Sequence, residues 1–200
     1  MQSDQQVTVS ESDTGWLFDG PSDSDALIFY PGAKVEETAY APLLHRLAAD
    51  TMDVFLIKMP FRLAFLDIDR GAEIPNHTSY QHYYYGGHSL GGAMAAICTP
   101  DLETPPDGLL LLASYPSKDL PENTDVLLIF GSEDRIVNLK KVEEADSFVA
   151  GHYRECKLEG GNHAQFGNYG PQKGDGEASM SAESQQEETL RLIRDVFWNA

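Results

Sequence analysis

The sequence contains few cysteines and none of the spacings that bind metals. Its only two, Cys98 and Cys156, lie in a predicted helix and a predicted strand, and nothing in the sequence pairs them. We therefore expect two buried free thiols and no disulfide framework. No arrangement of Cys and His resembles a zinc site. The sequence predicts neither a bound metal nor a cofactor.

Basic residues are also scarce. There are 14 Lys and Arg against 32 Asp and Glu, which gives a formal net charge of -18. Such a chain repels phosphates, so nucleic acids and anionic membrane surfaces are excluded as partners. The simplest interpretation of the charge is a solvated acidic surface, which favours solubility. We expect a monomer or a small homo-oligomer.

No apolar run reaches the length of a membrane span. Residues 1–6 are polar and lack the basic and apolar regions of a signal peptide. The sequence as written predicts a cytoplasmic protein. An extracytoplasmic location would follow if a signal or anchor had been removed.

The most informative stretch is residues 86–92, Gly-Gly-His-Ser-Leu-Gly-Gly. Residues 87–91 fit the G-x-S-x-G pattern of a nucleophile elbow, a strained turn that raises a serine, here Ser89, between a strand and a helix. A strand-like aromatic segment, residues 80–85, precedes the motif, and good helix formers follow it. These flanks argue against the alternative, a glycine-rich turn that happens to hold a serine.

Strand-like and helix-like segments alternate along the rest of the chain. The expected strands are residues 16–18, 26–30, 54–57, 80–85, 108–113, 125–130 and 153–158. The expected helices are residues 40–47, 63–68, 93–98 and 137–149, and a closing helix capped by Ser181.

This alternation predicts an α/β fold, a mostly parallel central sheet with helices on both faces. We expect one domain over residues 1–200, with residues 1–14 as a flexible N-terminal segment. The connection at residues 114–124 is too short for a cap domain, so the site should be open and shallow.

A serine nucleophile needs a base to take its proton and a carboxylate to orient that base. The candidate acid is Asp134, with its neighbour Glu133 as the alternative, although loop carboxylates also serve turn geometry. The candidate base is His163, in a glycine-rich segment after the last strand. His88 adjoins Ser89, but its side chain should point away from it. The remaining histidines lack a matching context.

An oxyanion hole needs two backbone N–H groups. One should belong to Leu90, which follows the nucleophile. The other should belong to Ala33, because Gly32 lets the chain turn inward just before it.

Four side chains are expected to line the substrate crevice. Lys34 could attract a substrate carboxylate, although a solvated lysine explains it equally well. Met59, Tyr115 and Gln165 follow strand ends or flank the candidate base.

Three segments, residues 30–35, 86–95 and 160–170, are similar to those of carboxymethylenebutenolidase-like (dienelactone hydrolase-like) α/β-hydrolases. The resemblance implies an α/β-hydrolase fold without a cap domain, with Ser89 as nucleophile, Asp134 as acid and His163 as base. True dienelactone hydrolases use a cysteine nucleophile, so their activity is not carried over. Similar proteins often carry an N-terminal anchor or signal, which this sequence does not show.

These observations predict a serine hydrolase that cleaves small carboxylic esters or lactones through an acyl-enzyme. An acyltransferase or thioesterase with the same triad is the alternative. A non-catalytic binding protein on the same fold is the third hypothesis.

Overall fold

The computed structural model describes residues 1–198, and its centre is a sheet of eight strands. The strands lie in the order β1-β2-β4-β3-β5-β6-β7-β8. Their bounds are Thr8–Ser12 (β1), Gly15–Asp19 (β2), Asp25–Tyr30 (β3), Asp53–Ile57 (β4), His82–His88 (β5), Gly108–Leu112 (β6), Asp125–Gly131 (β7) and Tyr153–Leu158 (β8). Strands β3 to β8 pair in parallel, whereas β1 and β2 pair antiparallel at one edge.

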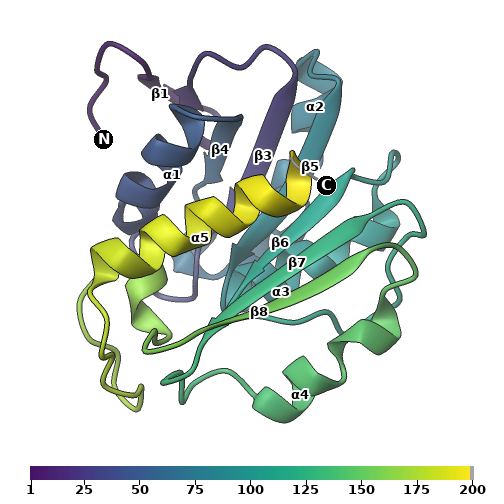
Figure 1. Ribbon diagram of the computed structural model, residues 1–200. Helices are drawn as coiled ribbons and strands as arrows, with labels where there is room; N and C mark the ends of the chain where they lie inside the picture. The colour runs from purple at the N-terminus through teal and green to yellow at the C-terminus, as the bar shows by residue number, and fades with distance from the viewer. Residues whose placement is uncertain (199–200) are drawn as a thin grey trace.

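Helices cover both faces of this sheet (Figure 1). The α-helices are Ala41–Ala48 (α1), Ile74–His77 (α2), Leu90–Cys98 (α3), Leu139–Glu143 (α4) and Ala182–Phe197 (α5). Short 3-10 helices span Glu37–Tyr40 (η1), Pro60–Arg62 (η2), Ala64–Leu66 (η3), Ile68–Gly71 (η4), Thr99–Asp101 (η5), Ala145–Phe148 (η6) and Ala164–Phe166 (η7). Helices α1 and α5 lie together on one face, and α3 packs against the other.

The central strands are apolar because both of their faces are buried. Along β3, Leu27 and Phe29 point into the core under α1 and α5, while Ile28 and Tyr30 point into the core on the side of α3. All six residues of this strand are buried. A parallel sheet covered on both faces requires such continuous apolar strands, and their runs in the sequence located them. The predicted fold class is confirmed.

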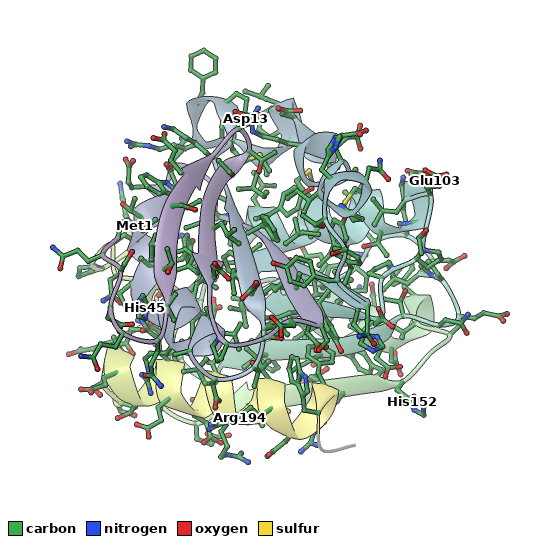
Figure 2. All side chains as sticks on the ribbon, turned by 90° about the horizontal axis from the view of Figure 1, so that it is seen from above. Met1, Asp13, His45, Glu103, His152 and Arg194 are labelled. Atoms are coloured by element: carbon green, nitrogen blue, oxygen red, sulfur yellow. The ribbon has the colours of Figure 1, made fainter. Side chains whose placement is uncertain are left out.

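The sheet edge extends further toward the N-terminus than the sequence suggested. We expected residues 1–14 to be a flexible segment and residues 16–18 to form an edge strand. Instead β1 pairs with β2 over five residues and makes the edge. Val7, just before β1, is 1% exposed within the core under α1 and α5. Figure 2 shows the turn of this hairpin at Asp13.

Two predicted helices are divided into shorter helices in the structure. Instead of one helix over residues 63–68, the connection from β4 to β5 contains η2, η3, η4 and α2. The helix predicted over residues 137–149 divides into α4 and η6. The closing helix begins as predicted, because the hydroxyl of Ser181 accepts the N–H of Ser184 at 3.1 Å. The connection at residues 114–124 contains no helix, consistent with the absence of a cap.

Both cysteines are free. Cys98 is buried in α3 as expected, and Cys156 in β8 is only partly buried. Among residues 1–198, no helix combines the length and apolar character needed to cross a membrane.

The strand order places a topological switch point between β3 and β5. Strand β4 lies on one side of β3, and β5 lies on its other side. The connections that leave β3 and β5 therefore run in opposite directions. Ligands of open α/β sheets bind at such switch points, beyond the carboxyl ends of the strands. Ser89 directly follows β5, and Ala33 lies in the loop after β3.

If the N-terminal strand belongs to the folded unit, Val7→Ala should lower the free energy of unfolding by about 2 kcal/mol. Two buried methyl groups are lost and a cavity is left behind. The exposed β1 residue Ser10 supplies the control, since Ser10→Ala should change stability by no more than about 0.5 kcal/mol. Urea unfolding followed by circular dichroism measures both. Equal stability of Val7→Ala and wild type would show that the segment does not contribute to the core.

Candidate active site

Ser89 occupies a strained turn between β5 and α3. Its backbone has φ 53° and ψ -124°, and its N–H donates to the carbonyl of Leu112 at 2.9 Å. The helix that follows approaches β3 so closely that a Cβ on Gly91 would lie 2.2 Å from the carbonyl oxygen of Tyr30. Only glycine fits at this position. The local geometry is therefore that of the predicted elbow, with a half-buried serine at its tip.

Left-handed backbone conformations gather at the same edge of the sheet. The non-glycine residues with positive φ are Lys34 (62°), Phe61 (52°), Arg62 (59°), Ser89 (53°) and Ala113 (48°). They follow the carboxyl ends of β3, β4, β5 and β6, which are neighbours in the sheet. Such conformations persist only where surrounding contacts enforce them, and they cluster at functional sites.

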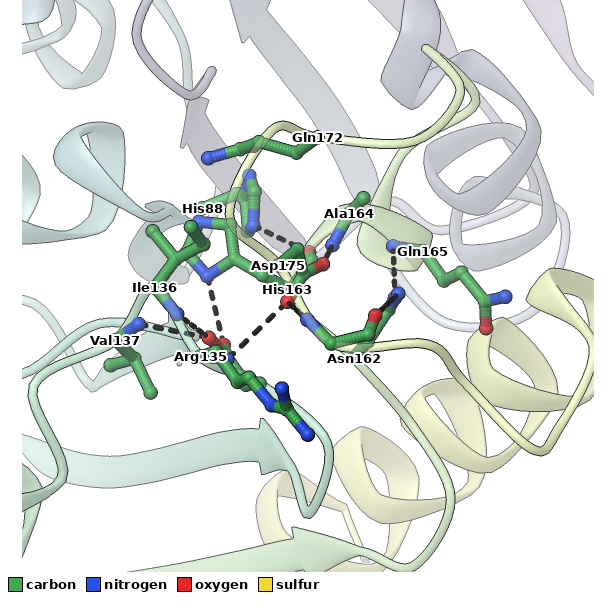
Figure 3. Close-up of polar contacts among 12 residues, drawn as sticks. His88, Arg135, Ile136, Val137, Asn162, His163, Ala164, Gln165, Gln172 and Asp175 are labelled. Carbon is green, nitrogen blue, oxygen red and sulfur yellow. Dashed lines mark hydrogen bonds and ion pairs between the residues drawn. The ribbon is translucent and has the colours of Figure 1, made fainter.

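Asp134 lies in the loop after β7 and is 4% exposed. One carboxylate oxygen, Oδ1, accepts the N–H groups of Ile136 and Val137, each at 2.8 Å. The other, Oδ2, accepts a hydrogen bond from Nδ1 of His163 at 2.8 Å (Figure 3). The carboxylate thus receives three donors and holds the imidazole in one orientation.

His163 follows β8 and is 1% exposed. Because Nδ1 bonds to a carboxylate, the proton of the neutral ring lies on Nδ1 and leaves Nε2 unprotonated. Among residues 1–198, Nε2 is buried and has no hydrogen-bond partner. The Ser89 hydroxyl is therefore not hydrogen-bonded to it in this conformation. The ring lies against that of His88, the residue before Ser89, with centroids 4.6 Å apart.

Of the two candidate acids, the structure brings only Asp134 to the histidine. Glu133 is half-buried, and its Oε1 accepts the hydroxyl of Ser132 at 3.2 Å. The ring nitrogens of His88 bond to Tyr40 and to the backbone of His163, and the expectation that the ring points away from Ser89 stays a prediction. Its Nδ1 is 2.7 Å from the hydroxyl of Tyr40, and its Nε2 is 3.1 Å from the backbone oxygen of His163.

Two further residues, Asp175 and Gln185, hold the His163 loop in place. Asp175 accepts the N–H of Ala164 at 2.9 Å and the N–H of Arg135 at 3.4 Å, which joins the loops of base and acid (Figure 3). Gln185, fully buried on α5, accepts the N–H of Asn162 at 3.0 Å and donates to its carbonyl at 2.8 Å. Gln185 lies in the polar run of residues 183–189, so nothing in the local pattern indicates that it is buried.

The backbone amides of the loop after β3 differ in whether they have hydrogen-bond partners. The amide of Gly32 donates to the hydroxyl of Tyr40 at 3.0 Å, and that of Lys34 to the carbonyl of Arg62 at 2.8 Å. Within the described part of the chain, the amide of Ala33 between them makes no hydrogen bond. The amide of Leu90 belongs to the first turn of α3, where N–H groups lack intrahelical partners.

The four predicted substrate-contacting side chains are dispersed. Lys34 is exposed beside the β3 loop. Met59 is 5% exposed and packs in the core on the side of α3, and Tyr115 is partly buried against the same core. Gln165 lines a cavity of about 680 Å³ between η7 and residues 170–182. This cavity adjoins the His163 loop, but Ser89 is not among its lining residues.

Nothing in the described residues forms a metal site, since no three His, Cys, Asp or Glu side chains gather in a suitable cluster within residues 1–198. The polar groups at the strand ends suit acyl chemistry instead: a serine, a carboxylate-bound imidazole and unpaired backbone amides.

Comparison with known proteins identifies the class. Residues 26–187 match the model of the alpha/beta hydrolase family, and the chain belongs to that family. A search of curated proteins by sequence returns no significant match.

Solved structures resemble the whole chain. One is a dienelactone hydrolase from Anabaena variabilis, with TM-score 0.66 and 12% identity over 96% of this chain and 99% of that one. Carboxyl esterase 2 from Tuber melanosporum has TM-score 0.66 and 11% identity over 96% and 86%. The type II thioesterase BorB, from the borrelidin biosynthetic cluster, has TM-score 0.63 and 15% identity over 98% and 97%. At these identities the likeness establishes the fold.

The burial of His88 should make stability depend on pH. Burial, followed by the nearby His163, holds the pKa of His88 well below its ordinary value of 6.5. The folded state keeps this ring neutral, whereas the unfolded state takes up a proton below about pH 6.5. The contribution of His88 to stability is therefore complete above that pH and declines as the pH falls.

We accordingly expect the free energy of unfolding of wild type to fall relative to that of His88→Gln between pH 6.5 and 5. The limiting slope is about 1.4 kcal/mol per pH unit. Denaturant titrations at several pH values measure it, with the exposed His152→Gln as the matched control. A difference between wild type and His88→Gln that stays constant with pH would contradict a neutral buried imidazole.

Proposed function

We propose that the protein is a serine hydrolase that cleaves carboxylic esters or lactones through an acyl-enzyme. One observation carries the proposal: a buried imidazole, His163, bonded at 2.8 Å to a buried carboxylate, Asp134, beside an elbow that holds Ser89. Membership of the alpha/beta hydrolase family supports hydrolase chemistry in general.

The proposed reaction begins when Nε2 of His163 takes the proton of the Ser89 hydroxyl and the oxygen attacks the ester carbonyl. The lack of a hydrogen bond between them in this conformation is compatible with this role, because catalytic hydrogen bonds often tighten only when substrate binds. Asp134 keeps the ring in the required tautomer and stabilises the imidazolium.

The tetrahedral intermediate carries its charge on the former carbonyl oxygen. We assign the amides of Ala33 and Leu90 to that oxygen, since both lie at the switch point and neither N–H donates a hydrogen bond within a helix or strand. His163 then protonates the leaving alcohol, and water, activated by the same ring, hydrolyses the acyl-Ser89 ester. In a lactone the leaving alcohol remains attached to the acyl group.

Ser89→Ala should abolish labelling by a fluorophosphonate probe and lower the rate of p-nitrophenyl acetate hydrolysis by at least about a thousandfold. Mass spectrometry should locate the probe on Ser89 of the wild type. The exposed Ser147→Ala is the control and should be labelled and active. A folded wild type that neither reacts with the probe nor hydrolyses the ester would favour a binding protein on this fold. An acetyl thioester and added alcohols, tested in parallel, would reveal thioesterase or acyltransferase activity.

The two candidate acids can be separated by isosteric variants. Asp134→Asn should lower kcat about 10³- to 10⁴-fold, because the amide favours the wrong tautomer of His163. Glu133→Gln makes the same chemical change at the neighbouring residue and should retain wild-type kcat. The measurement is steady-state hydrolysis of p-nitrophenyl acetate. The assignment of the acid would be reversed if Glu133→Gln showed the larger loss.

A further inference from the structure

Three consecutive hydrogen bonds connect the loop after β3 with the loop that carries His163. The amide of Gly32 donates to the hydroxyl of Tyr40 at 3.0 Å. The same hydroxyl lies 2.7 Å from Nδ1 of His88, and Nε2 of His88 lies 3.1 Å from the backbone oxygen of His163. All four residues are buried. The three bonds therefore lie in the interior of the protein.

The chemistry of the groups fixes the direction of every bond. A carbonyl oxygen only accepts, so Nε2 of His88 carries a proton and donates it to the oxygen of His163. Burial holds the pKa of His88 well below its ordinary value, so the ring is neutral and its Nδ1 accepts. The hydroxyl of Tyr40 must then donate to Nδ1, and it accepts from Gly32. Burial also holds the pKa of Tyr40 well above its ordinary value, which keeps this hydroxyl protonated.

Aromatic packing leaves the two rings little freedom. The ring of Tyr40 lies 5.3 Å from that of Phe29, and the ring of His88 lies 5.7 Å from that of Phe166. A Cβ on Gly32 would lie 2.7 Å from the hydroxyl of Tyr40 and 2.9 Å from Nδ1 of His88. The glycine at this position thus allows the loop to reach the two side chains.

We infer that Tyr40 and His88 are positioning residues that set the distances between the oxyanion loop, the nucleophile and the base. This inference rests on the proposed function. Gly32 precedes Ala33, His88 precedes Ser89, and the last acceptor is the carbonyl of His163 itself. The chain of three hydrogen bonds therefore adjoins the oxyanion amide, the nucleophile and the base, which must all act on the same carbonyl.

Different side chains hold the backbone and the ring of His163. Asp134 fixes the ring through Nδ1, and His88 fixes the backbone through the carbonyl. Loss of the donor at His88 would remove the side-chain bond to the His163 carbonyl and free the loop to shift. A shift of about 1 Å in a catalytic group can cost about a hundredfold in rate.

Kinetics of four variants on p-nitrophenyl acetate test the inference. His88→Phe keeps a ring of similar size but neither polar atom, and should lower kcat about 10- to 100-fold with little change in KM. His88→Gln retains one donor and one acceptor and should recover most of kcat. Tyr40→Phe removes a single hydroxyl and should also lower kcat.

Tyr85→Phe is the matched control for Tyr40→Phe. Tyr85 is equally buried, and its hydroxyl donates to the carbonyl of Gly71 at 3.2 Å in the core on the side of α3. Its loss should change stability and leave kcat unchanged. Wild-type kcat in folded Tyr40→Phe and His88→Phe would overturn the inference. If His88→Phe does not fold, Tyr40→Phe decides alone.

A second readout separates failure of this inference from failure of the proposed function. The Nδ1 proton of His163, bonded to Asp134, should give a low-field proton resonance that His163→Gln removes. We expect its shift or its exchange rate to change in His88→Phe and Tyr40→Phe, and to return toward wild type in His88→Gln. Should the wild type be inactive and unlabelled at Ser89, the proposed function fails, and this resonance still tests the positioning. An unchanged resonance in both variants would refute it.

Discussion

The buried hydrogen bond between His163 and Asp134 is the interaction on which the arrangement of the site depends. The Asp134 carboxylate is 4% exposed, and burial of a carboxylate is costly unless its oxygens find hydrogen-bond partners. Asp134 meets this requirement through two backbone amides of its own loop. The position of His163 then depends on whatever holds its loop. That loop is tied to α5 through Gln185 and to the acid loop through Asp175.

The same edge of the sheet contains the polypeptide's least favourable backbone conformations. Lys34, Ser89 and Ala113 adopt positive φ just beyond β3, β5 and β6. The parallel strands that place these turns side by side are also the most completely buried part of the protein. A rigid apolar sheet can impose strained turns on its loops, which a flexible scaffold could not maintain. The buried strands thus hold the strained turns of the site in place.

The sequence predicted what depends on local pattern and missed what depends on distant partners. Continuous apolar runs located β3, β4, β6 and β7, and the G-x-S-x-G spacing located the elbow, because each is a local property. Strand β1 escaped prediction because its residues are polar and mostly exposed, so it lacks a clear alternation. The buried Gln185 and the Tyr40 contact of His88 span 23 and 48 positions. Their partners become apparent only when the chain has folded.

The two histidines at the centre show how surroundings assign different roles to identical side chains. Their rings lie 4.6 Å apart, a separation at which two imidazolium ions would repel strongly. Among the described residues, the ring nitrogens of His88 bond to a hydroxyl and a carbonyl, and burial keeps the ring neutral. His163 alone has a carboxylate to stabilise a positive ring. In the proposed reaction, the proton of Ser89 would therefore pass to His163, and the neutral His88 beside it would not oppose the positive charge.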